Sequence, residues 1–494
     1  MDPWQNISHQ TREQIRELQD KKLAQFINEY LYPFSPYYRN LFDGCRIDPR
    51  KIRTVEDLKQ IPLTAKSDFL ASQGKPEKFR EFILQPDQKK MFQYWPKERL
   101  LALKVNSLWR GKDYAKEYLA REFRPTFMTF TTGTTNSPIS FLYTQYDINN
   151  LSLSGQRMLA LFDVEESGRI VNMFPFAPHL AFWQVVFGGL SAGVLTLSTG
   201  GGKVMGTEGN LAAILKMKPS LILGVPGYVY HVMRAAQEKG RDMSFVKKVV
   251  LGAARVTEPF KIKLAGMLEA MGARDVSILG TYGFTEARSA WAECPTPVGI
   301  SSGYHLYPDK EIFEIVDPDS GHTKHEEEDG ELVYTALDAR GSAVIRYRTG
   351  DYVKGGISYA ACPHCRRLVG RISSDITRLS DTRDLQLSKI KGSLVNLDHF
   401  ASCLEEFDSI EEWQVEIRKK DNDPHEIDEL VVYAAAKKEC NMNQLKDDIK
   451  RKIHQATEIS PNDIIFLSLE EMVKRLELET ASKEKRIKDL RSAA

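Results

Sequence analysis

The sequence predicts an α/β protein with a large N-terminal domain of helix-covered sheets and a small C-terminal α+β domain. The chain has 494 residues, which is more than one hydrophobic core usually serves. From residue 127 to about 360, short apolar runs such as "SLILGVP" alternate with helical segments such as "GNLAAILKMK". That alternation is typical of sheets covered by helices. After "RYRTGD" the chain becomes more charged, as expected of a separate small domain.

The expected domain boundaries follow from these changes along the chain. Residues from about 10 to 30 place Ile15, Leu18, Leu23 and Phe26 at helical spacing among charged residues. We therefore expect a helical N-terminal part of the large domain over 1–95, its α/β core over 96–375, and the small domain over 376–494. Sheets of this kind place their ligands at strand ends rich in glycine and small residues.

The amino-acid composition is that of an ordinary globular protein. Hydrophobic residues make up 42% and charged residues 27%, and 68 basic residues balance 67 acidic ones. This balance argues against a nucleic-acid partner, which usually requires a clearly basic surface. The N-terminus has no apolar signal core, and the longest apolar run is broken by Gln184 and several glycines. We expect a cytoplasmic protein with no membrane partner, in which six cysteines are unlikely to form structural disulfides.

A threonine-rich stretch, "FMTFTTGTTNSP", lies between two β-prone runs. Such a loop can direct backbone N–H groups and hydroxyls at one anion, and Gly133 allows the sharp turn that this requires. The donors are Thr131, Thr132, Thr134 and Thr135. Taken alone, the stretch is better explained as a polar hairpin turn. It lacks the spacing of a P-loop.

Three later stretches change that interpretation: "LGTYGFTEAR", "VIRYRTGDYV" and the lysine-rich "LETASKEKRIKD". In this order and at this separation they resemble the adenylate-forming superfamily of acyl-CoA synthetases and adenylation domains, over roughly residues 95–494. The chain looks most similar to the phenylacetate-CoA ligase type, on the evidence of "SPISFLYTQYDI" after the threonine loop and "GELVYTALDARGSAVIRYRTGD". The resemblance implies that the small domain is mobile and rotates between two half-reactions.

The resemblance also implies that ATP and Mg²⁺ convert a carboxylic acid to an acyl-adenylate with release of pyrophosphate. Glu286 is a hard oxygen ligand suited to Mg²⁺, Thr285 can donate to the α-phosphate, and Asp351 can accept from both ribose hydroxyls. Tyr282 offers a flat face to adenine. The expected nucleotide-binding residues are Thr131, Thr132, Gly133, Thr134, Thr135, Gly252, Ala253, Ala254, Tyr282, Gly283, Asp351 and Arg371.

A lysine that bridges the attacking carboxylate and the α-phosphate would lower the barrier electrostatically. In related ligases the tail reads roughly Gly-Lys-x-x-Arg, which aligns Lys483 with the catalytic lysine. The preceding glycine is Ser482 here, so Lys485 is the alternative. The expected catalytic residues are therefore Lys483, Glu286 and Thr285. For the arginine between the two domains we prefer Arg371, with Arg378 as the runner-up and a hinge between 375 and 384.

"CPHC", containing Cys362 and Cys365, predicts a zinc site or a redox pair rather than a structural disulfide. The resemblance matches Cys294 and His305 to them, which gives a closed Cys₃His set for structural Zn²⁺. The gap from Cys294 to His305 is longer than in typical relatives, so His364 is the next candidate. The alternative is that these residues simply lie in turns.

The expected acid-binding residues are His179, Phe176 and Tyr282, in an aromatic-rich segment that core packing explains equally well. We expect a small, aromatic carboxylic acid and transfer to CoA as the co-substrate. The alternative acceptors are an amine, a carrier protein or a small inorganic nucleophile. A non-catalytic nucleotide-binding protein is a third hypothesis, against which Glu286, Asp351 and Lys483 argue. A homodimer is left open as the assembly.

Overall fold

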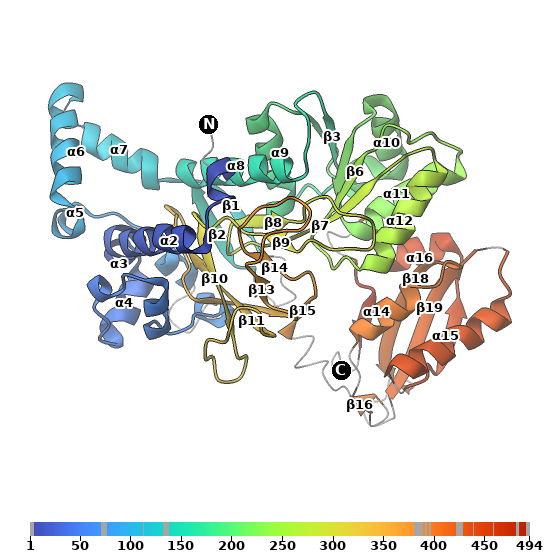
Figure 1. The fold of residues 1–494 in the computed structure, drawn as a ribbon. Coiled ribbons are helices and arrows are strands. Elements are labelled where there is room, and N and C mark those ends of the chain that lie inside the picture. The colour runs from blue at the N-terminus through green and yellow to red at the C-terminus, as the bar shows by residue number, and fades with distance from the viewer. Residues whose placement is uncertain are drawn as a thin grey trace.

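The structure is a computed structural model (Figure 1). It describes residues 4–70, 77–111, 113–131, 138–379, 389–390, 393–394, 397–420, 428–437, 439–457, 459–480 and 484–490. Among the described helices, none combines the length and the apolarity that crossing a membrane requires.

The N-terminal part of the chain is helical. The first long helix begins after Thr11, whose side chain and Gln14 form a reciprocal capping box. Seven α-helices are described before the first strand: α1 (Trp4–Ile7), α2 (Arg12–Phe26), α3 (Tyr32–Phe34), α4 (Pro36–Gly44), α5 (Gln88–Tyr94), α6 (Lys97–Arg110) and α7 (Tyr114–Phe123). Between α2 and α5 lie a π-helix, η1 (Ile27–Leu31), and 3₁₀ turns η2 (Pro49–Lys51), η3 (Val55–Gln60), η4 (Lys66–Phe69) and η5 (Lys78–Phe82).

A nine-stranded sheet forms the centre of the large domain, in the order β13-β14-β9-β8-β7-β6-β5-β3-β4. Its strands are β3 (Arg169–Asn172), β4 (Leu195–Ser198), β5 (Leu221–Gly224), β6 (Lys248–Leu251), β7 (Ser277–Phe284), β8 (Ser289–Ala292), β9 (Tyr304–His305), β13 (Ile357–Ser358) and β14 (Arg371–Ile372). Neighbours from β7 to β4 run parallel, and β8 turns antiparallel to β7. The covering helices are α8 (Gln145–Leu161), α9 (Leu180–Ala192), α10 (Gly202–Met217), α11 (Pro226–Glu238) and α12 (Glu258–Ala270).

Two further groups of strands complete the large domain. The antiparallel sheet β10-β11-β12-β15 contains β10 (Glu311–Val316), β11 (Gly330–Ala336), β12 (Tyr347–Val353) and β15 (Ile376–Arg378). The hairpin of β1 (Pro125–Phe130) and β2 (Ser140–Thr144) carries the threonine loop between its strands. The main hydrophobic core of these elements runs from Trp4 to Ile372. A smaller cluster of Tyr143, Leu151 and Leu180 packs with Phe127 of β1.

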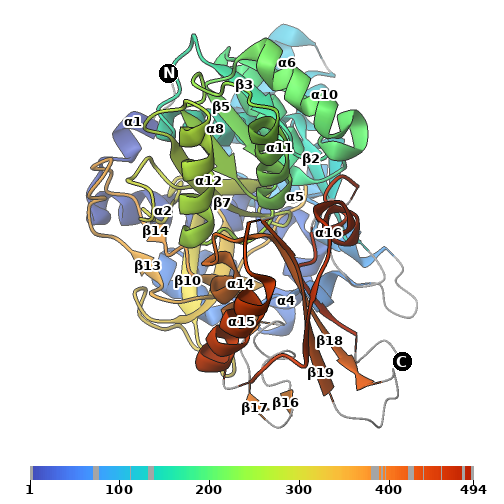
Figure 2. The same cartoon turned by 90° about the vertical axis from the view of Figure 1, so that its right-hand side faces the viewer.

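The C-terminal part has its own four-stranded sheet, in the order β20-β19-β18-β21. Its elements are β16 (Lys389–Ile390), β17 (Ser393–Leu394), α14 (Asp398–Glu405), β18 (Ile410–Lys419), β19 (Asp428–Ala436), α15 (Met442–Thr457), β20 (Asp463–Phe466), α16 (Leu469–Leu476) and β21 (Ile487–Asp489). Its hydrophobic clusters lie between Leu397 and Leu478. Figure 2 places it beside α10, α11 and α12. The predicted fold class, a large α/β domain with a small α+β domain, is confirmed.

The core of the large domain contains an acidic side chain, Glu311 on β10, which is 2% exposed. Its Oε1 accepts hydrogen bonds from Trp291 Nε1 at 2.9 Å and from the Tyr307 N–H at 2.6 Å. Burial raises the pKa of Glu311 to about 8. The folded protein therefore holds a proton that the unfolded chain releases above about pH 4.5, so this group lowers the free energy of unfolding as pH rises from about 4.5 to 8.

We expect Glu311→Gln to stabilise the protein at alkaline pH. Glutamine keeps the Oε1 acceptor and does not ionise, so it removes a cost of about 5 kcal/mol at most above pH 8. Urea unfolding of the variant and the wild type should give similar stabilities near pH 5 and diverge by pH 9. Glu327→Gln, at an exposed position, is the control. Parallel pH profiles for Glu311→Gln and the wild type would contradict this account.

Candidate active site

A sharp turn in β12 presents Asp351, the carboxylate predicted to bind ribose. Gly350 has φ of 73°, a left-handed conformation that glycine adopts without steric cost. The Thr349 hydroxyl donates to Leu332 O at 2.8 Å and accepts from the Asp351 N–H at 3.1 Å. The arginine and threonine of "RTGD" therefore build the strand, because Arg348 also pairs with Glu331. Asp351 is therefore the residue of the motif whose side chain could bind a ligand.

The end of β7 brings Tyr282 to Asp351. The Tyr282 hydroxyl donates to Asp351 Oδ2 at 2.7 Å, and its ring stacks near Trp291 and Tyr304, with centroids 5.9 Å apart in both pairs. Burial and the Asp351 carboxylate raise the pKa of Tyr282 well above its ordinary value, so the hydroxyl remains a donor. Gly283 is required at this point because a β-carbon there would approach Ala290 Cβ to 2.6 Å.

The end of the neighbouring strand β6 carries the predicted Gly252-Ala253-Ala254 segment. A β-carbon at Gly252 would overlap the Thr281 hydroxyl, which donates to Leu251 O at 3.0 Å. Ala253 is exposed and has φ of 67°, a region that a non-glycine residue seldom occupies. Backbone strain of this kind is concentrated at ligand sites. The segment therefore lies beside Tyr282 and has the geometry expected of a ligand-binding strand end.

Glu286, the predicted magnesium ligand, lies two residues beyond β7. Its Oε1 accepts a hydrogen bond from the Tyr347 hydroxyl at 2.8 Å, and Tyr347 is 2% exposed. Tyr347 immediately precedes the "RTGD" motif and was not singled out in the sequence. It fixes one carboxylate oxygen and connects Glu286 to the strand that carries Asp351. A hard carboxylate held in this way is suited to a hard cation beside a polyphosphate, so the residues fit Mg²⁺. Thr285 precedes Glu286 in the same turn, and its carbonyl accepts from Arg288 N–H at 3.1 Å.

The structure separates the two candidate arginines. Arg378 lies on β15, which pairs with β12, and its Nε is 3.1 Å from Asp351 Oδ1. Burial acts to lower the pKa of Arg378, but the carboxylates of Asp351 and Glu286 and nearby tyrosines raise it overall. Arg371, our first choice from the sequence, lies instead on β14 and donates to Ser302 O at 2.7 Å. The geometry therefore favours Arg378, because local sequence could not reveal which strand pairs with β12.

The threonine loop leaves the β1–β2 hairpin beside His179. The Thr131 N–H donates to Ile139 O at 3.0 Å, and the Ile139 N–H donates to Thr131 Oγ1 at 3.1 Å. These two hydrogen bonds hold Thr131 and Ile139 together at the base of the loop. The Phe130 N–H donates to Pro178 O at 2.8 Å, and His179 Nδ1 lies 3.2 Å from Phe130 O. Thr132, Gly133, Thr134 and Thr135 lie outside the described residues.

A pocket of about 260 Å³ lies between the large domain and the C-terminal tail. Phe176, His179 and Lys203 line it from the large domain, and Glu479, Thr480 and Glu484 line it from the tail. Lys483, the predicted catalytic lysine, lies outside the described residues. Its alternative, Lys485, is exposed. Tyr282 does not line this pocket, so the three residues predicted to bind the acid are divided between two places.

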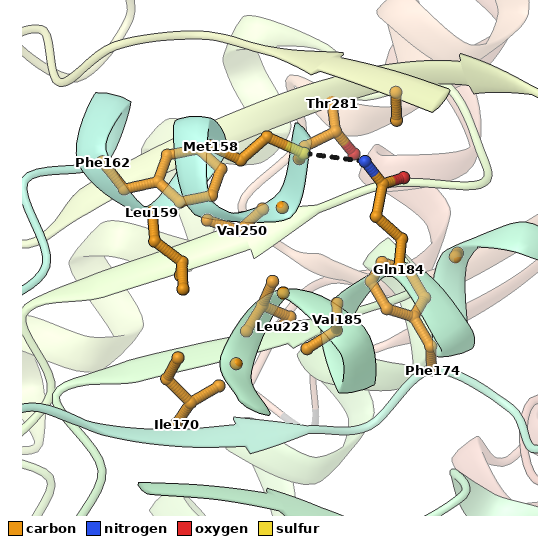
Figure 3. Close-up of a pocket in the computed structure, with 15 residues that line it drawn as sticks. Met158, Leu159, Phe162, Ile170, Phe174, Gln184, Val185, Leu223, Val250 and Thr281 are labelled. Atoms are coloured by element: carbon orange, nitrogen blue, oxygen red, sulfur yellow. Dashed lines mark hydrogen bonds between the residues drawn. The ribbon is translucent and has the colours of Figure 1, made fainter. Parts of the chain in front are cut away.

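A second, apolar pocket of about 50 Å³ lies inside the large domain, between α8, α9 and the central sheet (Figure 3). It is lined by Gly155, Met158, Leu159, Phe162, Ile170, Phe174, Ala181, Gln184, Val185, Gly188, Gly189, Leu223, Val250, Thr281 and Ala290. The Gln184 amide donates to Met158 Sδ at 3.3 Å and to Ser154 Oγ at 3.1 Å. Thr281 precedes Tyr282 on β7, which places this pocket behind the Tyr282–Asp351 pair.

A group of three cysteines and one histidine forms a candidate metal centre away from these pockets. The ligand atoms of Cys294, His305, Cys362 and Cys365 all lie within 4.8 Å of one another. Cys294 Sγ is 3.7 Å from Cys362 Sγ, close to the separation of about 3.8 Å expected for two thiolates on one tetrahedral Zn²⁺. Cys365 Sγ is 3.2 Å from His305 Nε2.

The strands explain how these ligands meet. Ala292 on β8 pairs with His305 on β9. The antiparallel pairing therefore brings His305 close to Cys294 despite the long segment between them. His305 Nδ1 lies 3.3 Å from Ala292 O, and a hydrogen bond donated there leaves Nε2 for a metal. His364 is exposed and does not belong to the cluster. The four residues therefore fit a closed, structural Zn²⁺ site.

The sequence model of a family described as AMP-binding enzyme matches residues 59–338, more than half of the chain. This chain belongs to the AMP-binding enzyme family. The match and the curated relatives confirm the predicted resemblance to adenylate-forming, phenylacetate-CoA ligase-like proteins. The chain is an ATP-dependent adenylate-forming ligase.

Two curated relatives and one solved structure give the extent of the similarity. A phenylacetate-coenzyme A ligase of Thermus thermophilus is 26% identical over 75% of this chain and 72% of its own length. A phenylacetate-coenzyme A ligase of Aromatoleum evansii is 25% identical over 70% of this chain and 68% of its own. The structure of a 2-hydroxyisobutyryl-CoA ligase in the postadenylation state matches with a TM-score of 0.74 and 14% identity, covering 98% of this chain and 91% of that one.

Proposed function

We propose that this protein activates a small carboxylic acid with ATP and Mg²⁺ and transfers the acyl group to CoA. The observation that carries the proposal is the convergence of Tyr282, Asp351 and Glu286, the residues expected for adenine, ribose and metal, with Arg378 beside them. Tyr282 and Asp351 lie near the C-terminal ends of β7 and β12, strands of two different sheets, and Glu286 lies in the turn after β7. The ends of strands are where α/β folds bind ligands.

In the first half-reaction, a carboxylate oxygen attacks the α-phosphorus, and the bond to the β-phosphate breaks as pyrophosphate leaves. Asp351 would orient the ribose through its hydroxyls, and Thr131 with the following loop would surround the β- and γ-phosphates. Glu286 would hold Mg²⁺, which neutralises the charge that develops on the phosphates. Lys483 would approach from the tail, since Thr480 and Glu484 on either side of its segment line the interdomain pocket.

The interior pocket of Figure 3 is the proposed site for the acid's side chain. Phe162, Phe174 and aliphatic side chains line it, and the Gln184 amide is already engaged by Ser154 and Met158. The volume of about 50 Å³ and these contacts favour a small apolar side chain. The curated relatives, named phenylacetate-coenzyme A ligases, favour an aromatic one, for which the pocket would have to widen toward the roughly 150 Å³ of a cavity that holds benzene. Phe176 and His179 would then face the reacting carboxyl group and the entering acceptor from the interdomain pocket.

A panel of acids assayed for pyrophosphate release tests this proposal. We expect release with a small aromatic acid, and formation of a CoA thioester with AMP when CoA is added. Asp351→Asn should raise the KM for ATP by tenfold or more, because the negative charge is lost and one of the two acceptor oxygens becomes an NH₂ group that can only donate. Turnover independent of CoA would refute the CoA assignment in favour of an amine, a carrier protein or an inorganic nucleophile. No ATP-dependent product with any acid would refute the proposed reaction.

A further inference from the structure

Two glycines of the large domain lie against the C-terminal tail, on either side of residues 481–483. Gly202 begins α10, and Gly227 lies in the first turn of α11. A β-carbon at Gly202 would come within 2.7 Å of the Cα and carbonyl oxygen of Glu479. One at Gly227 would come within 2.5 Å of Glu484 Cδ. A larger residue at Gly202 would therefore displace the tail backbone, and one at Gly227 would displace the Glu484 side chain.

Polar contacts fasten Glu479 to the same helices. The Thr207 hydroxyl on α10 donates to the Glu479 carboxylate. His231 Nε2 on α11 lies 3.0 Å from Thr207 Oγ1 and 3.7 Å from Glu479 Oε1. Arg234 donates to His231 Nδ1 at 2.9 Å, which leaves Nε2 as the nitrogen that carries the proton toward Thr207 and Glu479. The tail is thus attached to the large domain by directed bonds at one side of the segment.

A buried ion network fastens the other side. Arg486 lies 3.0 Å from both Glu484 and Glu412, and Arg234 on α11 lies 3.3 Å from Glu412. The side chains of Glu412 and Glu484 are 1% and 8% exposed. Breaking the Arg486–Glu484 pair would leave the buried Glu484 carboxylate without this ion-pair partner, which is unfavourable. The network therefore joins α11, β18 and the tail in this arrangement of the two domains.

We propose that Gly202 and Gly227, with Thr207, His231 and Arg234, form a docking seat that positions the lysine-bearing tail for adenylation. The inference rests on the proposed function, because the seat is needed only if the protein carries out the proposed adenylation step. Attack of a carboxylate on a phosphate brings two anions together and needs a bridging cation. Attack of CoA on a finished acyl-adenylate does not, so the seat is dispensable for the second step. These are positioning residues that act through the tail.

Alanine substitutions at the two glycines test the seat. Alanine favours a helix over glycine, so the variants keep the helix propensity of α10 and α11. At Gly202 the added β-carbon would also approach Tyr228 Cε2 on α11 to 2.8 Å, a contact that is separate from the tail. We expect Gly202→Ala to slow ATP- and acid-dependent pyrophosphate release about 100-fold, because it displaces tail backbone, with the KM for the acid unchanged. Gly227→Ala should cost about tenfold, because it displaces a side-chain end. Both should transfer a supplied acyl-adenylate to CoA at the wild-type rate. Gly266→Ala on α12, where a β-carbon meets nothing within 4 Å, is the matched control.

One further measurement separates the seat from a general defect and from the proposed function. Trypsin should cut the tail of Gly202→Ala faster than that of Gly266→Ala, whether or not an active acid has been found. Equal tail cleavage in these two variants, or an equal loss in both half-reactions, would overturn the seat. A wild type that releases no pyrophosphate would overturn the proposed reaction but not the seat.

Discussion

Lys483→Ala should reduce acid-dependent pyrophosphate release by about 10²- to 10³-fold, the range for removing one preorganised group that stabilises developing charge. The physical reason is the approach of a carboxylate to a triphosphate, two anions that a single ammonium can bridge. Thr480 and Glu484 line the interdomain pocket opposite His179, so the tail reaches this chamber on both sides of the lysine's segment. Release of radiolabelled pyrophosphate, measured at saturating ATP, checks the prediction.

Lys485→Ala is the matched control for this substitution. Lys485 lies two residues further along, has the same charge and is exposed, and its carbonyl oxygen accepts from Gln414 Nε2 at 2.7 Å. We expect this variant to remain within about threefold of the wild type. Transfer of a supplied acyl-adenylate to CoA should survive in both variants. If Lys485→Ala is inactive and Lys483→Ala is not, the alignment of the tail is wrong by two residues. If both remain active, the tail does not supply the catalytic lysine.

The fold was largely predictable because its signals are local. Alternating apolar runs and helical segments predicted the sheet with its helices. The higher content of charged residues toward the C-terminus predicted the second domain. Tyr282, Glu286 and Asp351 could be selected as candidates because each belongs to a recognisable motif, and the structure brings Tyr282 and Asp351 into contact and joins Glu286 to the same strand through Tyr347. Tyr347 carried no such signal, since a tyrosine before Arg348 has the same spacing as any core residue of a strand. Its role comes from β12 lying beside the turn after β7.

The remaining parts of the site depend on contacts between distant segments. Arg371 and Arg378 are seven residues apart and belong to different sheets, so local sequence could not decide between them. The pairing of Arg371 with His305 and of Arg378 with Asp351 separates them. Similarly, the contacts of Glu479 and Glu484 depend on the arrangement of two domains, which no motif within the tail records.

Removing one ligand of the Cys₃His cluster should remove zinc and destabilise the sheet around it. We expect the wild type to purify with one equivalent of zinc and Cys362→Ala to purify without it, and we expect the variant to melt lower by on the order of 10 °C. The cluster joins β8 and β9 to the turn before β14, and without a metal three thiols and an imidazole would crowd a largely buried space. Metal analysis of protein made without a histidine tag, with thermal unfolding, checks both effects.

The same substitution should also weaken ATP binding, although the cluster does not belong to the proposed nucleotide site. Tyr304 directly precedes the ligand His305, and its ring stacks 5.9 Å from that of Tyr282, which bonds Asp351. A loosened β9 would therefore shift Tyr282, the tyrosine proposed to contact adenine, and raise the KM for ATP while the rate at saturating ATP changes less. His364→Ala, in the same turn but outside the cluster, should leave zinc content, melting and KM unchanged. Less than half an equivalent of zinc in the wild type would show that the cluster is not a structural zinc site.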